Sequence, residues 1–308
     1  MNRGAQTVAT GDTHDDRPPG RQPSRRRALW TIVGVAGGLL ALGVLFSVLQ
    51  ATVRAGATDT FSVEVAEGVD VSIPRGDIRV SADGNAGTLS AESSYFIRSP
   101  SLDLTEEAGV TRLRGECGWP SSCDIDVTGR VPVGTDVTLR AERGDLVVDG
   151  RPGVVDVRSE RGSVRVEGPA RDVQIASGNG EVTVIGARGA VRAEAIAGDI
   201  NLGRLSGSIR ARGGEGVVFG DELRSAEVEV EGGAGGVRLG FAEPPDRVEV
   251  DVGEGPAEII VPAGRYRLDT DINQGDLVVE GIIEDPDATR RIRVRTIQGD
   301  ATIEGVPG

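Results

Sequence analysis

The sequence lacks lysine, so all 34 basic residues are arginine, and it has one histidine, two cysteines and only 3% aromatic residues. The histidine, His14, lies near the N-terminus, so the remainder of the chain has no imidazole for metal binding or acid–base catalysis. Few aromatic side chains also argue against a large mixed core. The many valines, alanines and glycines instead favour a structure built from short, similar strands.

Positive charge is also scarce relative to negative charge. The formal net charge is -14, and residues 54–308 contain 28 arginines against 45 acidic residues. A surface of this sign repels phosphate, which excludes nucleic acid as an expected partner. Arg140 and Arg158 lie close to Glu142 and Glu160 in the sequence, which predicts charge balance on one outward face.

A single long apolar run is present near the N-terminus. Residues 1–27 are polar and predict a disordered tail. Residues 28–53 contain the uncharged run Leu29–Leu49, which is long enough to cross a bilayer as a helix. Arginines 25–27 precede it and predict a cytoplasmic N-terminus, so the chain after a linker at 54–60 is expected outside the cell membrane.

Two other interpretations of this run remain open. The Ala55-Gly56-Ala57 stretch fits a signal-peptidase site, with cleavage after Ala57. The arginines loosely match a twin-arginine export signal. A retained single-pass anchor is favoured because the apolar run is longer than a usual signal core, and all three interpretations export the rest of the chain.

The two cysteines predict a disulfide. Cys117 and Cys123 lie in the loop-like stretch GECGWPSSCDI, with no third thiol anywhere in the chain. Two thiols without histidine make a poor metal site, whereas an exported loop favours an oxidised pair. The alternative is a pair of inert free thiols.

A nine-residue repeat dominates the centre of the chain. Between Asp136 and Ser225 ten consecutive units have Val, Leu or Ile in second place, and eight of them have Gly in ninth place. The third place is polar in eight units. This alternation predicts strands with one buried face, joined by turns at the glycines.

Alternate units resemble each other more closely than neighbours do, so the full repeat is two units long. Stacked coils of this length predict parallel strands in which side chains two units apart are in contact. The two expected buried columns are Leu146, Val164, Val182, Ile200 and Val218, and Val137, Val155, Val173, Val191 and Ile209. An antiparallel up-and-down sheet is the alternative, although it gives no reason for the longer period.

The sequence therefore predicts an all-β fold. Its architecture is a single-stranded parallel β-helix, or β-solenoid, with coils of about 18 residues, preceded by one transmembrane helix. We expect one extracytoplasmic domain at 61–308. Its last strand, at Ile303, is expected to leave an open edge that another chain could pair with.

Related motifs extend beyond the centre. Gly-Asp units begin at Gly76, Gly275 and Gly299, and a VPxG module begins at Val131 and again at Val261. Together with the N-terminal anchor, these motifs resemble a bacterial "putative adhesin" β-strand-repeat family of unknown function, related to head-GIN and Lia-G-type envelope proteins. The resemblance covers nearly all of 61–308 and implies a surface-exposed β-solenoid with adhesion or envelope-stress roles. It offers no catalytic residues.

Two sets of acidic residues are candidate sites. Nonapeptide repeats can bind calcium, and four aspartates directly follow turn glycines: Asp145, Asp199, Asp276 and Asp300. The G-G-x-G-x-D run of such repeats is absent, so turn capping or solvent exposure is favoured. The run Glu284, Asp285 and Asp287 is the best candidate for carbohydrate hydrolysis, but a solvated loop is favoured there too.

Three aromatic residues form the best candidate for a contact patch. Tyr95, Phe96 and Trp119 lie in predicted loops, where they either bind a partner or cover the end of the core. The sequence predicts no enzyme, cofactor or metal. It predicts an adhesin-like envelope-contact protein whose partner is the cell wall, a surface polymer or an envelope protein. Envelope-stress sensing through a membrane partner is the first alternative, and a polysaccharide-active enzyme the second.

Overall fold

The computed structural model describes residues 55–63, 67–119 and 122–307. The predicted tail and anchor, 1–27 and 28–53, lie outside these residues. In the described ranges, no helix is long and apolar enough to cross a membrane. All of the described strands belong to one compact unit, Arg54–Gly308, and its β1 (Ala55–Val63) includes residues 55–60 of the predicted linker.

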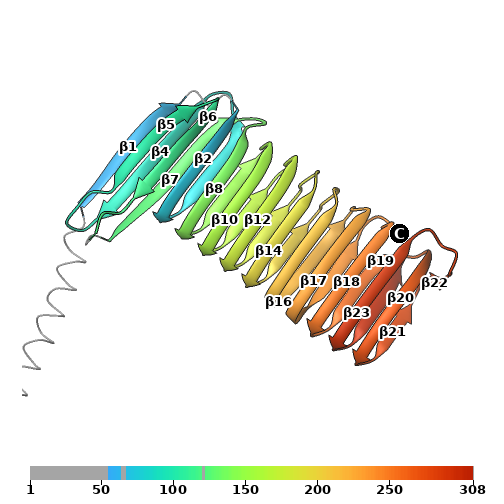
Figure 1. The fold of residues 1–308 in the computed structure, drawn as a ribbon. Helices are drawn as coiled ribbons and strands as arrows, with labels where there is room; N and C mark the ends of the chain where they lie inside the picture. Colours follow the sequence, from blue (N-terminus) through green and yellow to red (C-terminus); the bar gives the residue numbers. More distant parts are fainter. Residues whose placement is uncertain (1–54, 64–66, 120–121, 308) are drawn as a thin grey trace, which may run out of the picture. The chain divides into compact units, whose positions relative to one another are not determined.

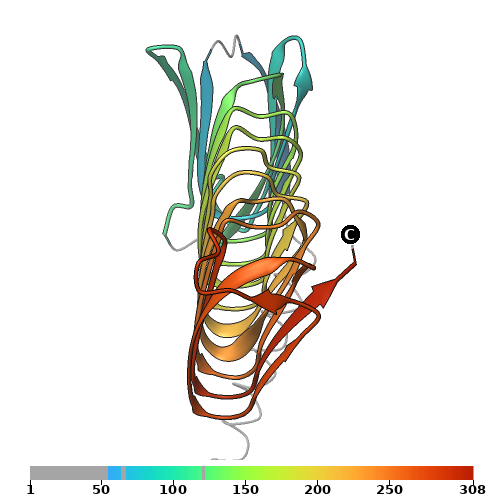
Figure 2. The ribbon, with the colours of Figure 1, turned by 90° about the vertical axis from the view of Figure 1, so that its right-hand side faces the viewer.

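The chain is all-β where it is described, with one large and mostly parallel sheet (Figure 1). The strands form two hydrogen-bonded ladders, on two sides of a narrow interior (Figure 2). We call them the first and second ladders, and we call one strand of each, with the corner that joins them, a rung.

The first ladder contains, in spatial order, β5 (Ser101–Glu107), β6 (Val110–Glu116), β2 (Gly68–Arg75), β8 (Asp136–Arg143), β10 (Val154–Arg161), β12 (Asp172–Asn179), β14 (Val191–Ala197), the first half of β16 (Ile209–Leu223), the first half of β17 (Glu227–Phe241), β18 (Arg247–Glu254), β23 (Arg291–Gln298) and β20 (Arg265–Gln274). The short β22 (Ile283–Glu284) pairs with the start of β20.

The second ladder contains, in spatial order, β1, β4 (Gly87–Tyr95), β7 (Cys123–Pro132), β3 (Ile78–Gly84), β9 (Leu146–Gly150), β11 (Val164–Glu167), β13 (Val182–Ile185), β15 (Ile200–Gly203), the second halves of β16 and β17, β19 (Ala257–Pro262), β24 (Ala301–Val306) and β21 (Leu277–Glu280).

The predicted spacing of two units is confirmed in the centre of both ladders. Val155 pairs with Val173 and Val173 with Val191, in parallel and in register. Every residue of the two predicted columns is buried, with at most 3% of its surface exposed. The predicted interior is therefore a continuous aliphatic core, and the antiparallel alternative is wrong for these strands.

The spacing widens toward the C-terminus, where the repeat is hardest to read in the sequence. Ile209 pairs with Val228, which lengthens the repeat by one residue, and Val228 pairs with Val248, which lengthens it by one more. The register of β16 against β17 shifts between Gly220 and Leu223, which marks an irregularity within β16. The core remains continuous across it, since Val228 and Val248 stay buried.

Corner glycines permit the rungs to stack closely. Gly216 has a φ of +124°, a conformation that side chains resist, and a Cβ built on it would lie 2.5 Å from the carbonyl oxygen of Gly198 in the preceding rung. This approach between backbones explains why glycine occupies the ninth place of the repeat.

The N-terminal end departs from the predicted all-parallel arrangement. β1 pairs antiparallel with β4, β4 with β7, and β5 with β6. Ala108 and Gly109 both have positive φ, at 52° and 77°, as a tight two-residue hairpin turn requires. Residues 85–135 therefore leave the repeat, and β2 stacks directly against β8, which follows this whole segment in the sequence.

The C-terminal end corrects another prediction. The expected open edge at Ile303 is wrong, because β24 pairs with β19 on one side and with β21 on the other. Likewise β23 lies between β18 and β20. The last strands of the chain are thus interior, and the preceding segment, β20–β21, forms the terminal rung.

Candidate contact surfaces

Outward-facing charges form columns across the first ladder. Residues in the third place of the repeat are neighbours on adjacent strands, and their order along the ladder is Asp70, Thr138, Asp156, Gln174, Arg192, Arg210, Glu229, Glu249, Arg293 and Asp269. Cross-strand neighbours of opposite charge stabilise a sheet, and like charges destabilise it. This column therefore bears on the order in which strands stack.

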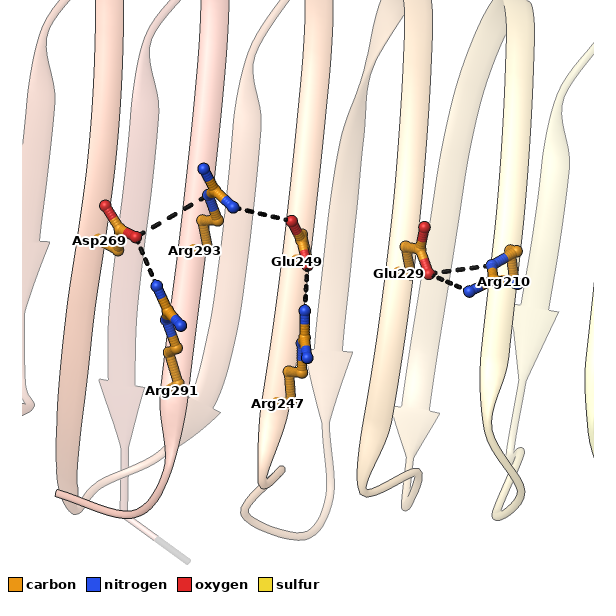
Figure 3. A network of polar contacts seen from close by, with 7 residues as sticks. All are labelled: Arg210, Glu229, Arg247, Glu249, Asp269, Arg291 and Arg293. Carbon is orange, nitrogen blue, oxygen red and sulfur yellow. Dashed lines mark hydrogen bonds and ion pairs between the residues drawn. The ribbon is translucent and has the colours of Figure 1, made fainter.

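The interior position of β23 places an arginine between two carboxylates. Arg293 Nη1 lies 3.2 Å from Glu249 of β18, and its Nε lies 3.9 Å from Asp269 of β20 (Figure 3). Asp269 also pairs with Arg291, at 2.7 Å. If β20 stacked on β18 in chain order, Glu249 and Asp269 would be like-charged neighbours.

A second column repeats the same arrangement. Arg295 of β23 lies 3.4 Å from Asp251 of β18 and 3.4 Å from Asp271 of β20. Both arginines thus separate acidic strands, so the charges favour the interchange of strand order seen at this end.

Further along the same face, arginine and glutamate form direct forked pairs. Arg212 donates from Nε and Nη2 to the two carboxylate oxygens of Glu231, at 2.7 and 2.9 Å. Arg210 donates from Nε and Nη2 to one oxygen of Glu229, at 2.9 and 2.5 Å. Such charge-assisted bonds fix side-chain geometry more firmly than a single contact does.

These contacts shift the acidity of the carboxyl groups. The hydrogen bond from Arg212 lowers the pKa of Glu231, and that from Arg247 lowers the pKa of Glu249. The hydrogen bond from Arg291 likewise lowers the pKa of Asp269. All three carboxylates therefore stay charged to a lower pH than ordinary carboxyl groups do.

The predicted charge balance between Arg140 and the neighbouring glutamates takes a different form in the structure. Arg140 donates to Asp70 of β2, at 2.8 Å. Asp70 also faces Arg112 of β6, at 3.8 Å. These partners come from strands outside the regular repeat, which the repeat alone did not indicate.

The aspartates that follow turn glycines link consecutive rungs. Asp145 Oδ1 accepts the backbone N–H of Ser163 at 2.8 Å, and Asp199 Oδ1 accepts that of Val217 at 2.8 Å. Asp300 accepts the N–H of Asp276 at 2.9 Å. Each carboxylate thereby caps a corner, as the sequence favoured. Across the described residues no group of three potential metal-ligating side chains occurs.

The acidic run near the C-terminus is also held by internal contacts. Asp285 accepts the backbone N–H of Asp287 at 3.0 Å and pairs with Arg265 at 3.1 Å. These contacts, the backbone hydrogen bond first, lower the pKa of Asp285. A carboxyl group that acts as a general acid needs a raised pKa, whereas the pKa of Asp285 is lowered.

The structure places the three predicted aromatic residues in different environments. Tyr95 lies opposite Cys123 in the β4–β7 pair and packs against the core. The backbone N–H of the half-buried Phe96 donates to Ser122 O, at 3.3 Å. The side chain of Trp119 is 90% exposed. Cys117 and Cys123 form the predicted disulfide, which closes the loop carrying Trp119.

Sequence reasoning missed a hollow on the second ladder. It has a volume of ≈ 280 Å³, and Phe219, Ile185 and Leu202 supply its apolar lining. Gly203 lies between Ile185 and Asp221 in the sheet, so the strand between these two side chains carries none at this position. A Cβ on Gly203 would already touch Ile185, at 3.6 Å. The signal was available, because Phe219 occupies a third place that is polar in most repeats.

Polar groups surround this hollow. Asn201 and Thr183 both bond to Glu181, at 2.7 and 3.1 Å, which orients their side chains. Arg204 and Glu222 also line the hollow, and both have positive φ, at 52° and 50°. Non-glycine residues in this conformation cost free energy, and such strain concentrates at functional positions.

Among known proteins, the chain resembles solved structures of low sequence identity. No family model matches the sequence, and no curated protein matches it. Among solved structures, a "putative adhesin" from Parabacteroides merdae matches with 11% identity and a TM-score of 0.42, over 82% of this chain and 96% of the other.

Two proteins from Parabacteroides distasonis match in the same way, each over 82% of this chain. A "putative adhesin" has 13% identity and a TM-score of 0.38, over 97% of its length. A "putative lipid binding protein" has 11% identity and a TM-score of 0.32, over 96% of its length.

Proposed function

We propose that the chain is a membrane-anchored β-solenoid that makes physical contact with a surface polymer outside the cell and performs no catalysis. The regular parallel register and the two ladders support the solenoid architecture, with strands that stack in one direction. The anchor at 28–53 and the cytoplasmic N-terminus rest on hydropathy and on the preceding arginines.

The observation that carries the proposal is the hollow at Phe219. Most third-place residues are polar, whereas Phe219 presents an aromatic side chain that is 37% exposed beside Ile185. An aromatic surface flanked by amide, carboxylate and guanidinium groups suits a sugar ring, which has apolar faces and hydroxyl edges. A polysaccharide of the envelope is accordingly the proposed partner.

Binding of purified polymer by the full chain tests the proposal. We expect Phe219→Ala to weaken binding to envelope polysaccharide by about tenfold, since aromatic anchors contribute more than ~1 kcal/mol to contact. Val147→Ala is the matched control, because Val147 occupies the same outward column on β9. Equal binding by both variants and the unmodified chain would refute a role for the hollow.

Affinity capture from cells separates this function from envelope-stress sensing. The full chain, recovered with and without a wall-active antibiotic, should retain polymer under both conditions. Exclusive recovery of a membrane sensor protein would replace the contact role with a regulatory one. Cleavage of an acidic polysaccharide, abolished by changing Asp285 and Asp287, would restore the enzymatic alternative.

A further inference from the structure

The terminal rung, β20–β21, leaves part of the core uncovered. Leu277 and Val279 of β21 occupy inward positions, yet they are 41% and 37% exposed. Their partners on β24, Ala301 and Ile303, are fully buried. A further strand on this side would complete the burial that the interior rungs receive.

The outer edge of β20 is open over most of its length. Within the part of the chain that is described, β22 alone pairs on this side, and only with Arg265 and Tyr266. Residues 267–274 pair with β23 on their other side. At ~3.3 Å per residue this edge extends for roughly 25 Å, enough for a peptide of about eight residues.

Backbone groups on the open edge point outward. Arg267 N–H donates to Arg290 O at 2.8 Å, on the side of β23. The N–H and C=O groups of successive residues in a strand point to opposite sides. The N–H groups of Leu268, Thr270 and Ile272 therefore face the open edge. These unpaired groups can template an added strand.

The open edge carries two carboxylates and, at its start, Arg267, which lies opposite Arg291 of β23. The two carboxylates indicate the chemistry of an added strand. Asp269 and Asp271 project from β20, and on the paired side they face the arginines of β23. Asp271 is 72% exposed, so its carboxylate remains accessible to a second cation. Charge alternates from Glu249 through Arg293 to Asp269, and a strand with arginine opposite Asp269 and Asp271 would extend this alternation by one more step.

A second copy of the chain fits this edge less well. If two copies paired through this edge, Asp269 and Asp271 of one copy would face the same carboxylates of the other, and like charges would repel. Its opposite end is also acidic, because β5 carries Asp103, Glu106 and Glu107 on exposed positions. The charge of both ends thus favours a basic partner over self-association.

We propose that the edge of β20 and β21 docks an extended segment of a partner protein in which arginine alternates with aliphatic residues. The segment adds to β20 as a strand through residues 267–274. Its arginines pair with Asp269 and Asp271, and its aliphatic side chains cover Leu277, Val279 and the adjoining core. Docking here is independent of polymer contact at Phe219.

A peptide with the sequence of β23, RIRVRTIQ, is the probe, because that strand already satisfies the other side of β20. Fluorescence anisotropy of the labelled peptide with the full chain in detergent should show saturable binding. EIEVETIQ, with each arginine replaced by glutamate, is the matched control and should bind at least tenfold more weakly. Equal binding of both peptides, or none by RIRVRTIQ, would overturn the proposal.

Two variants locate the peptide on the edge. Asp271→Arg should weaken binding at least tenfold, while Asp221→Arg, on the other ladder, should leave it unchanged. Thr270→Pro removes an outward N–H and should also weaken binding, because the added strand loses one hydrogen-bond donor. The variant should still fold, since proline is accommodated on edge strands. Binding that survives both Asp271→Arg and Thr270→Pro contradicts the assigned edge.

Self-association and polymer binding provide the remaining controls. Sedimentation should show one copy of the chain per particle. If the unmodified chain forms dimers and Asp271→Arg dissociates them, the edge binds a second copy instead. Asp271→Arg should bind polysaccharide normally, and Phe219→Ala should bind the peptide normally. Failure of one site therefore remains distinguishable from failure of the other.

Discussion

Reversal of charge at Arg293 tests whether electrostatics stabilise the interchanged strand order at the C-terminal end. Arg293 pairs with Glu249 and Asp269, at 3.2 and 3.9 Å, with all three side chains partly exposed. Each exposed pair contributes ~0.2–1 kcal/mol, so Arg293→Ala should cost about 1 kcal/mol. Arg293→Glu adds two repulsions between cross-strand neighbours and should cost about 2 kcal/mol in total.

Urea unfolding, followed by circular dichroism, measures this loss, and hydrogen exchange locates it in β20 and β23. Arg192→Glu is the matched control, because it makes the same change in net charge on the same face. Its neighbours are Gln174 and Arg210, so glutamate there gains an opposite charge and should change stability by less than ~0.5 kcal/mol.

A compensating variant sharpens the result. Combining Arg293→Glu with Glu249→Arg and Asp269→Arg restores alternation with reversed signs, and should recover at least half of the lost stability. If Arg293→Glu and Arg192→Glu destabilise equally, the column does not stabilise the strand order and the electrostatic reasoning is wrong.

Three further predictions concern the interior, the ion pairs and the corners. Val173→Asp buries a carboxylate between valines and should cost at least ~4 kcal/mol in urea unfolding, whereas the exposed Gln174→Asp should cost less than ~0.5 kcal/mol; similar costs would contradict the assigned faces. The pKa values of Glu249 and Asp269 are lowered in the folded state, so their stabilisation is present above a pH of about 4 and is lost as pH falls through the folded pKa values. Thermal melts should therefore be nearly constant from pH 7 to 5 and drop below pH 4, less steeply in Glu249→Gln. Asp145→Ala removes the acceptor for a backbone N–H, so hydrogen exchange at Ser163 should accelerate by about tenfold; unchanged exchange would show that the carboxylate does not cap the corner.

Much of the repetitive fold could be predicted because its signals are local. Alternation of valine with polar residues assigns the two faces of each strand, and the glycine that ends most units marks the corners. The capping aspartates also follow from their position after these glycines, since a carboxylate there reaches the backbone of the next rung. None of these inferences needs contact between distant parts of the chain.

The candidate sites were less accessible to sequence reasoning. Tyr95, Phe96 and Trp119 are close to the cysteine loop in sequence, but their exposure depends on the pairing of β4 with β7, which is antiparallel and outside the repeat. The hollow at Phe219 depends on Gly203 of the preceding strand, β15, because the missing side chain creates the space. Within the repeat pattern, each of these residues is an isolated irregularity.

The sequence by itself determined the strand period, the inward residues and the glycine corners, because each depends on neighbours within one or two repeats. Tertiary structure alone decided the order of strands at both ends, where β2 stacks on β8 and β23 lies between β18 and β20. Every rung offers similar aliphatic residues to its neighbours, so the core accepts several stacking orders. In the order observed, arginines of β23 pair with carboxylates of β18 and β20, which are distant from them in the sequence, and β20–β21 is the exposed terminal rung.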